Sequence, residues 1–210
     1  MIKWIFFDID NTLYESKKLA EEARKNAVNA MISAGLPVQS VSETYTKLKQ
    51  IIDEYGPNYS KHFDKLVEQF DVAEDKYDII AAGVIAYHNT KFAMLKPSFE
   101  IINTLKELKK EYRLGIISNG RPVKQREKLI RLDLQDFFEV VVISEEIGTQ
   151  KPKPKIFRTA VENAGCKPEE AVMIGDKESD MAAEKIGMHT INIKDLEDFE
   201  QIKTEVDDIE

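Results

Sequence analysis

The chain has 210 residues and a formal net charge of −8, from 30 Lys and Arg against 38 Asp and Glu. No basic stripe offsets this acidity, which argues against duplex nucleic acid and anionic membrane surfaces as partners. A single cysteine, Cys166, excludes a disulfide framework and a multi-cysteine zinc site. No apolar run approaches the ~20 residues of a membrane span, and no signal peptide is recognisable. We therefore expect a soluble, cytoplasmic protein with one sizeable core.

Five short apolar runs are interpreted as strands, and they cover residues 2–7, 114–117, 140–143, 171–174 and 189–193. Their length and aliphatic or aromatic richness are typical of strands that are buried on both faces of a parallel sheet. Helical patterns separate the runs. One of these begins after Ser98, a candidate N-cap, and another extends from Pro154 to a terminating Gly165. This alternation predicts a doubly wound, Rossmann-like α/β sheet.

Residues 15–96 break this alternation, because only helical patterns occur there. Four apolar stripes with helical spacing follow one another, and glycines end the first two. Their members are Leu19, Ala23, Ala27, Ala30 and Ala34; Tyr45, Leu48, Ile52 and Tyr55; Phe63, Leu66, Val67 and Phe70; and Tyr77, Ile80, Ala81, Val84, Ile85 and His88. The pattern predicts a helical bundle over residues 15–96, inserted into an α/β domain of residues 1–14 and 97–210. A single mixed α/β domain with long crossovers is the alternative.

Polar side chains follow four of the apolar runs. They are Asp8, Asp10 and Thr12 after the first run, Ser118, Asn119 and Gly120 after the second, Lys151 after the third, and Asp176 with Asp180 after the fourth. In an open parallel sheet, ligands bind in the crevice outside the carboxyl ends of the strands. We therefore expect these residues to converge at one edge of the sheet.

Asp8 and Asp10 are two residues apart, and in extended chain this spacing directs both carboxylates to the same side. Two such anions at ~4 Å repel by about 4 kcal/mol at an effective dielectric near 20, so a pocket that also holds Asp176 and Asp180 needs cations. Oxygen-only ligands favour a hard ion such as Mg²⁺, and Lys151 supplies a second positive charge. This chemistry suits a phosphoryl group: one carboxylate attacks phosphorus and the other handles the leaving-group proton.

These residues resemble the motifs of the haloacid dehalogenase superfamily of aspartate-nucleophile phosphohydrolases. The first motif, D-x-D-x-T, corresponds to residues 8–12, and the second, a Ser or Thr at a strand end, to Ser118. The third, a Lys commonly before Pro, corresponds to Lys151, and the fourth, G-D-x₃-D, to residues 175–180. The match extends over residues 5–190 in the family order. The helical insert, residues 15–96, looks like the C1-type cap domain of one subfamily, and the remainder looks like its catalytic core.

The resemblance implies a role for each motif residue. Asp8 would be the nucleophile that forms an aspartyl-phosphate, and Asp10 would be the general acid and then the general base. Asp8, Asp176 and the backbone carbonyl of Asp10 would bind Mg²⁺, with Asp180 in support. Lys151 would neutralise Asp8 and the transferring group. The phosphoryl group would be held by Thr12, Ser118, Asn119 and Gly120.

The expected function is that of a Mg²⁺-dependent phosphatase for small phosphorylated metabolites of the phosphosugar or triose-phosphate type. The chain resembles archaeal small-metabolite phosphatases of this family, for which glyceraldehyde 3-phosphate is an expected substrate. Two enzymes of the same fold are alternatives: a 2-haloacid dehalogenase, which would not need Asp10, and a sugar phosphomutase. A non-catalytic phosphate-binding module is the alternative outside the enzymes. We expect a monomer or a small homo-oligomer whose partner is a small phosphomonoester.

Loop residues are weaker candidates for recognising the substrate, namely Tyr14, Tyr55, Asn58, Tyr59 and Arg121. The acidic C-terminal segment carries Leu196, Phe199 and Ile202 at intervals of three, which predicts a short packed helix with a frayed end. A tail that recruits a basic partner is the alternative for this segment.

Overall fold

The computed structural model describes residues 1–57, 59–72 and 76–209, and it divides the chain into two compact units. Met1–Ser16 and Leu95–Glu210 form the first, which we call the α/β unit. Lys17–Met94 forms the second, which we call the helical unit. The predicted boundaries, after residues 14 and 96, lie two residues from the limits of these units.

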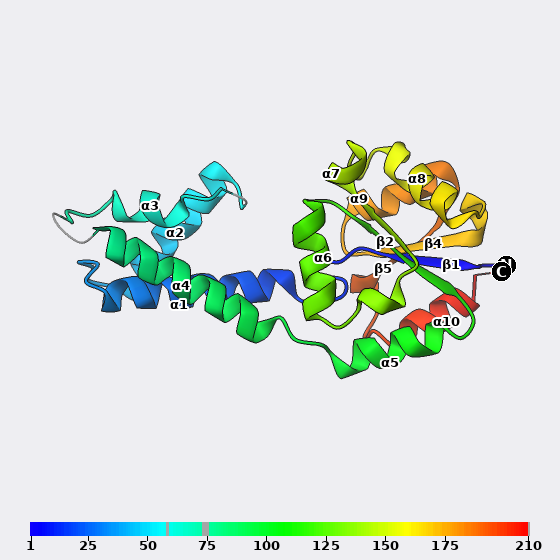
Figure 1. Cartoon of the computed structure of the whole chain (residues 1–210), viewed down its shortest axis with the longest axis horizontal. Helices are drawn as coiled ribbons and strands as arrows, with labels where there is room; N and C mark the ends of the chain where they lie inside the picture. Colours follow the sequence, from blue (N-terminus) through cyan, green and yellow to red (C-terminus); the bar gives the residue numbers. More distant parts are fainter. Residues whose placement is uncertain (58, 73–75, 210) are drawn as a thin grey trace. The chain divides into compact units, whose positions relative to one another are not determined.

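The α/β unit is built on five parallel strands in the order β3-β2-β1-β4-β5 (Figure 1). The strands are β1 Trp4–Phe7, β2 Arg113–Ser118, β3 Val140–Ile143, β4 Ala171–Gly175 and β5 His189–Asn192. The chain moves outward from β1 to β3 and then crosses back to β4, so the strand order reverses beside β1. The predicted doubly wound sheet is confirmed.

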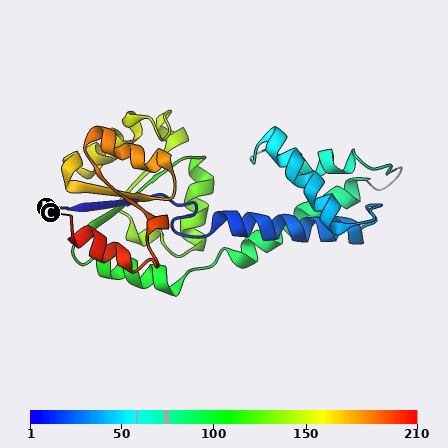
Figure 2. The same ribbon diagram turned by 180° about the vertical axis from the view of Figure 1, so that it is seen from behind.

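Side chains of β1 alternate between two hydrophobic clusters, one on each face of the sheet. Ile5 and Phe7 belong to one cluster, with apolar residues of α5, α6 and α10. Trp4 and Phe6 belong to the other, with apolar residues of α8. The bounds of these helices are α5 Phe99–Leu108, α6 Pro122–Arg131, α8 Pro154–Ala164 and α10 Gln201–Asp207. Figures 1 and 2 show α5 and α10 on one side of the sheet and α8 on the other.

The predicted signals at two helix ends are confirmed. Ser98 caps α5, because its side chain accepts a hydrogen bond from the Ile101 N–H at 3.4 Å. Gly165 ends α8 in a left-handed conformation with φ 65°, which a residue without a side chain adopts at little cost. The remaining short helices of this unit are α7 Ser144–Ile147, α9 Glu178–Met181, η1 Gln135–Phe137, η2 Pro168–Glu170, η3 Ala182–Ile186 and η4 Ile193–Asp195.

The helical unit contains four helices within its described residues, as the four apolar stripes predict. They are α1 Ser16–Ser33, α2 Val41–Tyr55, α3 His62–Val67 and α4 Lys76–Met94. Their core is a cluster separate from the two of the sheet, and its members include Met31, Leu48, Ile51, Leu66 and Ile79.

The predicted buried face of α4 is wrong. Tyr77 is 73% exposed and Ile85 is 60% exposed, whereas Ile79 and Gly83 are the buried positions. The helix is apolar on most of its surface, so the periodicity does not distinguish one face from another. The buried face of α4 is set by close packing against α1, since a Cβ added at Gly83 would lie only 2.7 Å from Cγ of Met31.

The C-terminal segment packs against the sheet, as predicted, but its helix α10 begins at Gln201, so Leu196 and Phe199 precede the helix and only Ile202 lies in it. Phe199 and Ile202 are buried in the same cluster as Phe7. The Tyr112 hydroxyl donates a hydrogen bond to Asp207 at 2.6 Å, so part of the acidic segment is bound to the α/β unit itself. Among the described residues, no helix is both long and apolar enough to cross a membrane.

Candidate active site

Asp8 directly follows β1 in the centre of the sheet and is only 4% exposed. Its backbone N–H donates to the Ile174 carbonyl at 2.9 Å, so the pairing of β1 with β4 continues one residue beyond the strand. The Ser118 hydroxyl donates to Asp8 Oδ1 at 2.8 Å, and Lys151 Nζ lies 3.0 Å from the same oxygen. The ends of β1 and β2 and the loop that follows α7 thus bring together residues that are far apart in the sequence.

Lys151 is buried between two carboxylates. Its Nζ lies 2.5 Å from Asp180 Oδ1 and donates to the Ile117 carbonyl at 2.8 Å, in addition to its contact with Asp8. Asn119 holds the backbone of this lysine from both sides. The Asn119 amide donates to the Lys151 carbonyl at 3.1 Å, and the Lys151 N–H donates to Asn119 Oδ1 at 2.9 Å. The ammonium group is therefore positioned by backbone as well as by charge.

Asp180 is fully buried at the start of the short helix α9. Burial raises the pKa of the Asp180 carboxyl, although the ammonium group of Lys151 opposes this shift. Its second oxygen accepts a hydrogen bond from the Lys177 N–H at 3.1 Å. A Cβ at Gly175 would collide with the Asp180 carboxyl group, so the close approach of β4 to Asp180 requires glycine.

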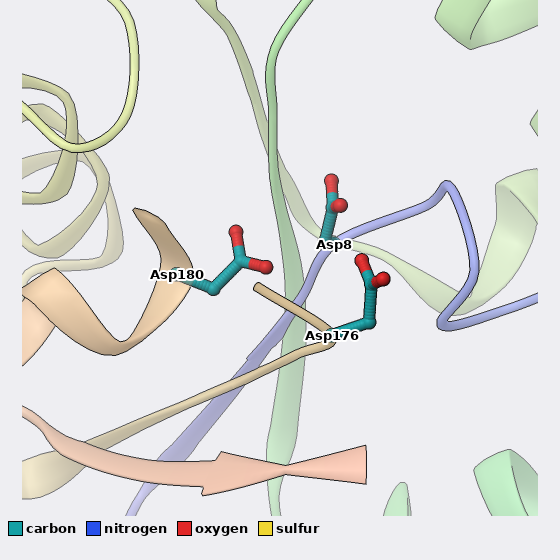
Figure 3. A group of neighbouring side chains, drawn as sticks. All are labelled: Asp8, Asp176 and Asp180. Atoms are coloured by element: carbon teal, nitrogen blue, oxygen red, sulfur yellow. The ribbon is translucent and has the colours of Figure 1, made fainter. Parts of the chain in front are cut away.

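Asp8, Asp176 and Asp180 form a buried acidic cluster in which one oxygen of each lies within 4.8 Å of the others. Figure 3 shows their carboxyl groups gathered from the ends of β1 and β4 and from α9. Both oxygens of Asp176 are buried without a hydrogen-bond partner among the described residues. The ammonium groups of Lys194 and Lys177 lie 3.4 and 3.9 Å from them. Buried carboxylate oxygens with unused lone pairs fit a hard divalent cation.

Asp10 lies beyond Asp8 in the turn after β1, and several groups of the α/β unit hold its carboxylate. Lys128 Nζ donates to both oxygens, at 2.8 and 2.7 Å. The Tyr14 hydroxyl donates to Oδ1 at 2.5 Å, and Gln125 Nε2 donates to Oδ2 at 3.2 Å. Burial alone would raise the pKa of Asp10, but the charge of Lys128 and these hydrogen bonds hold it below its ordinary value. Burial and the neighbouring Asp10 charge raise the pKa of Tyr14 strongly.

Thr12 and Gly120, both expected to hold a phosphoryl group, differ in what their polar groups contact. Thr12 is buried, and its hydroxyl has no hydrogen-bond partner among the residues that the structure describes. The Gly120 N–H donates to Ser144 Oγ at 2.9 Å, so this amide is already engaged within the protein.

The weaker substrate candidates lie in different parts of the chain. Tyr14 contacts Asp10 in the α/β unit, and Arg121 precedes α6 there. Tyr55 and Tyr59 stack on each other in the helical unit, with ring centroids 4.8 Å apart. Asn58 lies outside the described residues.

Sequence reasoning did not single out Gln125, Lys128 or Ser144, which contact the predicted site residues. A signal for the first two was available. In α6, which begins two residues after Gly120, Gln125 and Lys128 lie on the same face as the buried Leu129 and would be read as inward-facing polar residues. Ser144 follows β3 directly, at the same position relative to its strand as Asp8 has to β1.

Comparisons with known proteins assign the chain to a family. Residues 5–193 match the model of the haloacid dehalogenase-like hydrolases, in agreement with the resemblance of the motifs. A Methanopyrus kandleri protein named glyceraldehyde 3-phosphate phosphatase is 50% identical over 198 residues, which cover 92% of this chain and 84% of that protein. The Pyrococcus furiosus protein of the same name is 50% identical over 196 residues, which cover 92% and 81%.

A solved structure, that of a HAD-hydrolase from Bacillus subtilis bound to magnesium, has a TM-score of 0.63 to this chain at 18% identity. The alignment covers 94% of this chain and 89% of that chain, and at this identity it shows the common fold alone. The family model and the two archaeal relatives show the family of the chain as well as its fold. This chain belongs to the family of haloacid dehalogenase-like hydrolases.

Proposed function

We propose that this chain is a Mg²⁺-dependent phosphatase that hydrolyses glyceraldehyde 3-phosphate or a closely similar small phosphomonoester. The observation that carries the chemistry is the carboxylate of Asp8, buried beside Lys151 and two further carboxylates. The substrate is suggested by the relatives named glyceraldehyde 3-phosphate phosphatase, which share half of their aligned residues with this chain.

Asp8 is the proposed nucleophile. Ser118 and Lys151 both contact its Oδ1, and the described residues supply no hydrogen bond to Oδ2. One oxygen is thus held in place while the other is available to attack phosphorus. Attack forms an aspartyl-phosphate and breaks the bond from phosphorus to the sugar oxygen, which leaves as the alcohol.

Asp10 is the proposed proton carrier. In the first step it gives a proton to the departing oxygen, and in the second it takes one from the water that attacks the aspartyl-phosphate. The second step releases phosphate and regenerates the Asp8 carboxylate. Asp10 has a side chain that is 27% exposed, so it is reachable from the solvent side of the sheet edge, whereas Asp8 is almost fully buried.

Asp8, Asp176 and the backbone carbonyl of Asp10 are the proposed ligands of Mg²⁺, with Asp180 in support through Lys151. The two buried oxygens of Asp176, which accept no hydrogen bond from the described residues, favour this assignment. When bound, the cation would offset the negative charge shared by the carboxylates and the phosphoryl group. Lys151 supplies the fixed positive charge of the site, and its pairing with Asp180 keeps it there.

The phosphoryl oxygens are proposed to bind between Lys151, the Thr12 hydroxyl and the backbone amide of Asn119, and Ser118 would join them when its hydroxyl turns from Asp8 to the phosphoryl group. The buried Thr12 hydroxyl supports this role, because the described residues offer it no hydrogen-bond partner. Gly120 contributes through the conformation of the loop, since its own amide is bonded to Ser144. Residues 15–96 are the proposed cap, which would restrict the site to small substrates.

The hydrogen bonds and ion pair that hold Asp10 favour a phosphatase over a 2-haloacid dehalogenase. A halide leaves without a proton, so a dehalogenase has no use for a second carboxylate held in this way. A sugar phosphomutase would use the same residues, with a second hydroxyl group in place of water. Product analysis with a hexose 1-phosphate distinguishes these two, because only a phosphatase releases inorganic phosphate in equal amount to the substrate consumed.

The test is phosphate release from glyceraldehyde 3-phosphate by wild type and Asp8→Asn, each with Mg²⁺ and with EDTA. We expect activity only for wild type with Mg²⁺, and we expect glyceraldehyde 3-phosphate to lead a panel of phosphorylated metabolites by kcat/KM. Equal phosphate release in all four conditions contradicts the proposed chemistry. Robust release from other metabolites alone contradicts the proposed substrate.

A further inference from the structure

Helix α6 brings two side chains to Asp10, although none of its residues belongs to a motif of the family resemblance. Gln125 and Lys128 are three residues apart, so they lie on the same face of the helix. Gln125 is 2% exposed, and the Lys128 side chain is 21% exposed. Both end on the carboxylate of Asp10.

Lys128 contacts both oxygens of that carboxylate, at 2.8 and 2.7 Å. A single hydrogen bond would leave the carboxyl group free to turn about its bond to Cβ, whereas contact with both oxygens limits this rotation. The ammonium group also lies 5.8 Å from the centroid of the Tyr14 ring, and the hydroxyl of that tyrosine donates to Asp10. Lys128 and Tyr14 therefore restrain Asp10 together.

Gln125 connects Asp10 to the side of the site that holds Asp8. Its Nε2 lies 2.8 Å from Ser118 Oγ, 2.7 Å from the Asn119 carbonyl and 3.2 Å from Asp10 Oδ2. Ser118 in turn donates its hydroxyl proton to Asp8. One amide group thus links the residue that holds the nucleophile to the carboxylate that would transfer the proton.

We propose that Lys128 and Gln125 are positioning residues. They hold the Asp10 carboxyl group at the place from which it can reach the departing alcohol and the attacking water. This proposal deepens the proposed function and rests on the roles of Asp8 and Asp10 given there. Helix α6 would thus contribute to catalysis by holding Asp10, and its residues would not need to contact the substrate. An error of about 1 Å in the place of a catalytic group costs on the order of 10²-fold in rate.

The first experiment separates the two chemical steps. With 2,4-dinitrophenyl phosphate the leaving group needs no proton, so formation of the aspartyl-phosphate gives a burst of dinitrophenolate that does not depend on Asp10. We expect Lys128→Met to keep the burst rate within about twofold and to lower the steady-state rate about tenfold or more. With glyceraldehyde 3-phosphate, whose alcohol needs a proton, we expect kcat to fall by a similar factor at nearly unchanged KM.

Matched variants control for folding and for charge. Lys124→Met removes an exposed lysine from the same helix, and we expect wild-type rates in both steps. Lys128→Arg retains two donors for the carboxylate, and we expect it to recover most of the lost kcat. Gln125→Glu replaces the donor amide with an oxygen that faces the Asp10 carboxylate, the Ser118 hydroxyl oxygen and the Asn119 carbonyl. We therefore expect Gln125→Glu to lower kcat at least as much as Gln125→Asn does.

A double-mutant cycle tests whether Lys128 acts through Asp10. In the Asp10→Asn background, we expect Lys128→Met to change kcat by less than about twofold, because the group that it positions is already gone. The proposal is overturned if Lys128→Met leaves kcat unchanged, if it lowers burst and steady-state rates equally, or if its loss repeats in full in the Asp10→Asn background. Failure of Asp8→Asn to abolish the burst would instead contradict the proposed function.

Discussion

Asp8 and Asp10 are two residues apart, yet their carboxylates are held in different ways. Asp8 extends β1 into the buried edge of the sheet, where Ser118 and Lys151 contact one of its oxygens. Asp10 lies in the turn that follows, next to Asn11 with φ 60°, and both of its oxygens are engaged. A carboxylate with one free oxygen suits attack on phosphorus, whereas the contacts to both oxygens of Asp10 fix the place of its carboxyl group.

Lys151 and Lys153 lie in the same Lys-Pro-Lys-Pro run, and the structure separates them. Lys151 is 3% exposed and contacts Asp8 and Asp180, whereas Lys153 is exposed at the start of α8. We predict that Lys151→Met lowers kcat for glyceraldehyde 3-phosphate by about 10²-fold or more, since it removes the fixed positive charge beside the nucleophile. Steady-state kinetics of the purified variant measures this.

The control for this prediction is Lys153→Met, for which we expect kcat and KM within about twofold of wild type, as for most exposed substitutions. Comparable losses in the two variants would show that the charge of the run as a whole matters, and the assignment of Lys151 would be wrong. Circular dichroism of both variants checks that each is folded.

His62 predicts a pH dependence for the stability of the helical unit. Burial lowers the pKa of this imidazole below its ordinary value of 6.5, and the positive charge of Arg24 lowers it further. The hydrogen bond to the Gly56 carbonyl, at 2.9 Å, opposes this shift. The unfolded chain then binds a proton at a higher pH than the folded one. The contribution of His62 to the stability of the folded protein is therefore complete at a pH above the pKa of this residue in the unfolded chain. It is lost as the pH decreases through the pKa of His62 in the folded protein.

The measurement is the melting temperature of wild type and His62→Gln between about pH 5 and about pH 8, which brackets the ordinary pKa of histidine. We expect wild type to lose more stability than the variant over this range, because glutamine does not titrate. The effect is modest, since the ring is partly exposed to solvent. Parallel curves for the two proteins would rule out this role of His62.

At the scale of the elements, strands and helix ends follow from local sequence, and α5 offers a direct test. Ser98 accepts the Ile101 N–H at the first turn of this helix, which packs Leu105 and Leu108 against the sheet. We predict that Ser98→Ala lowers the free energy of unfolding by about 1 kcal/mol, because an N–H of the first turn loses its partner.

Denaturant unfolding of Ser98→Ala and Ser98→Asp checks this prediction. Aspartate also accepts the N–H and carries a negative charge favourable at a helix N-terminus, so we expect Ser98→Asp to match wild type or exceed it. If both substitutions cost the same, the loss would come from other contacts of the loop and not from the cap.

Which face of a helix is buried followed from local sequence for α5 but not for α4. In α5 the apolar residues Phe99, Ile102, Leu105 and Leu108 recur at intervals of three. Leu105 and Leu108 are buried, because polar residues mark the opposite face, whereas Phe99 at the start of the helix is 81% exposed. In α4 apolar residues occur on every side, and the buried positions, Ile79 and Gly83, are those that Met31 of α1 and its neighbours admit. Helix type is a local property, whereas the choice among apolar faces belongs to packing.

At the scale of the whole molecule, the acidic cluster predicts that Mg²⁺ stabilises the folded protein. Asp8, Asp176 and Asp180 are brought together only in the folded state, so a cation bound there favours folding by about 2.7 kcal/mol at 100 times its Kd. We expect the melting temperature to rise with Mg²⁺ concentration and to return with EDTA. Calorimetry detects this without any assay of activity.

Asp176→Asn is the matched control for the effect of Mg²⁺. Its side chain has nearly the same size, but it lacks the negative charge and one of the two buried carboxylate oxygens. We expect the variant to melt at the same temperature with and without Mg²⁺. A rise equal to that of wild type would place the ion elsewhere on this acidic chain.

Local patterns in the amino-acid sequence are enough to predict the α/β fold, the helical insert and the sheet edge where Asp8, Ser118, Lys151 and Asp176 come together. Strand burial and the positions that follow strands are written in patterns a few residues long, and parallel strands bring their carboxyl ends to one edge. Packing between remote segments brings Lys128 and Gln125 to Asp10, places Ser144 where it accepts the hydrogen bond of the Gly120 N–H, and selects the buried face of α4. These choices depend on the distance and direction between segments that are remote in sequence, and no local periodicity encodes them.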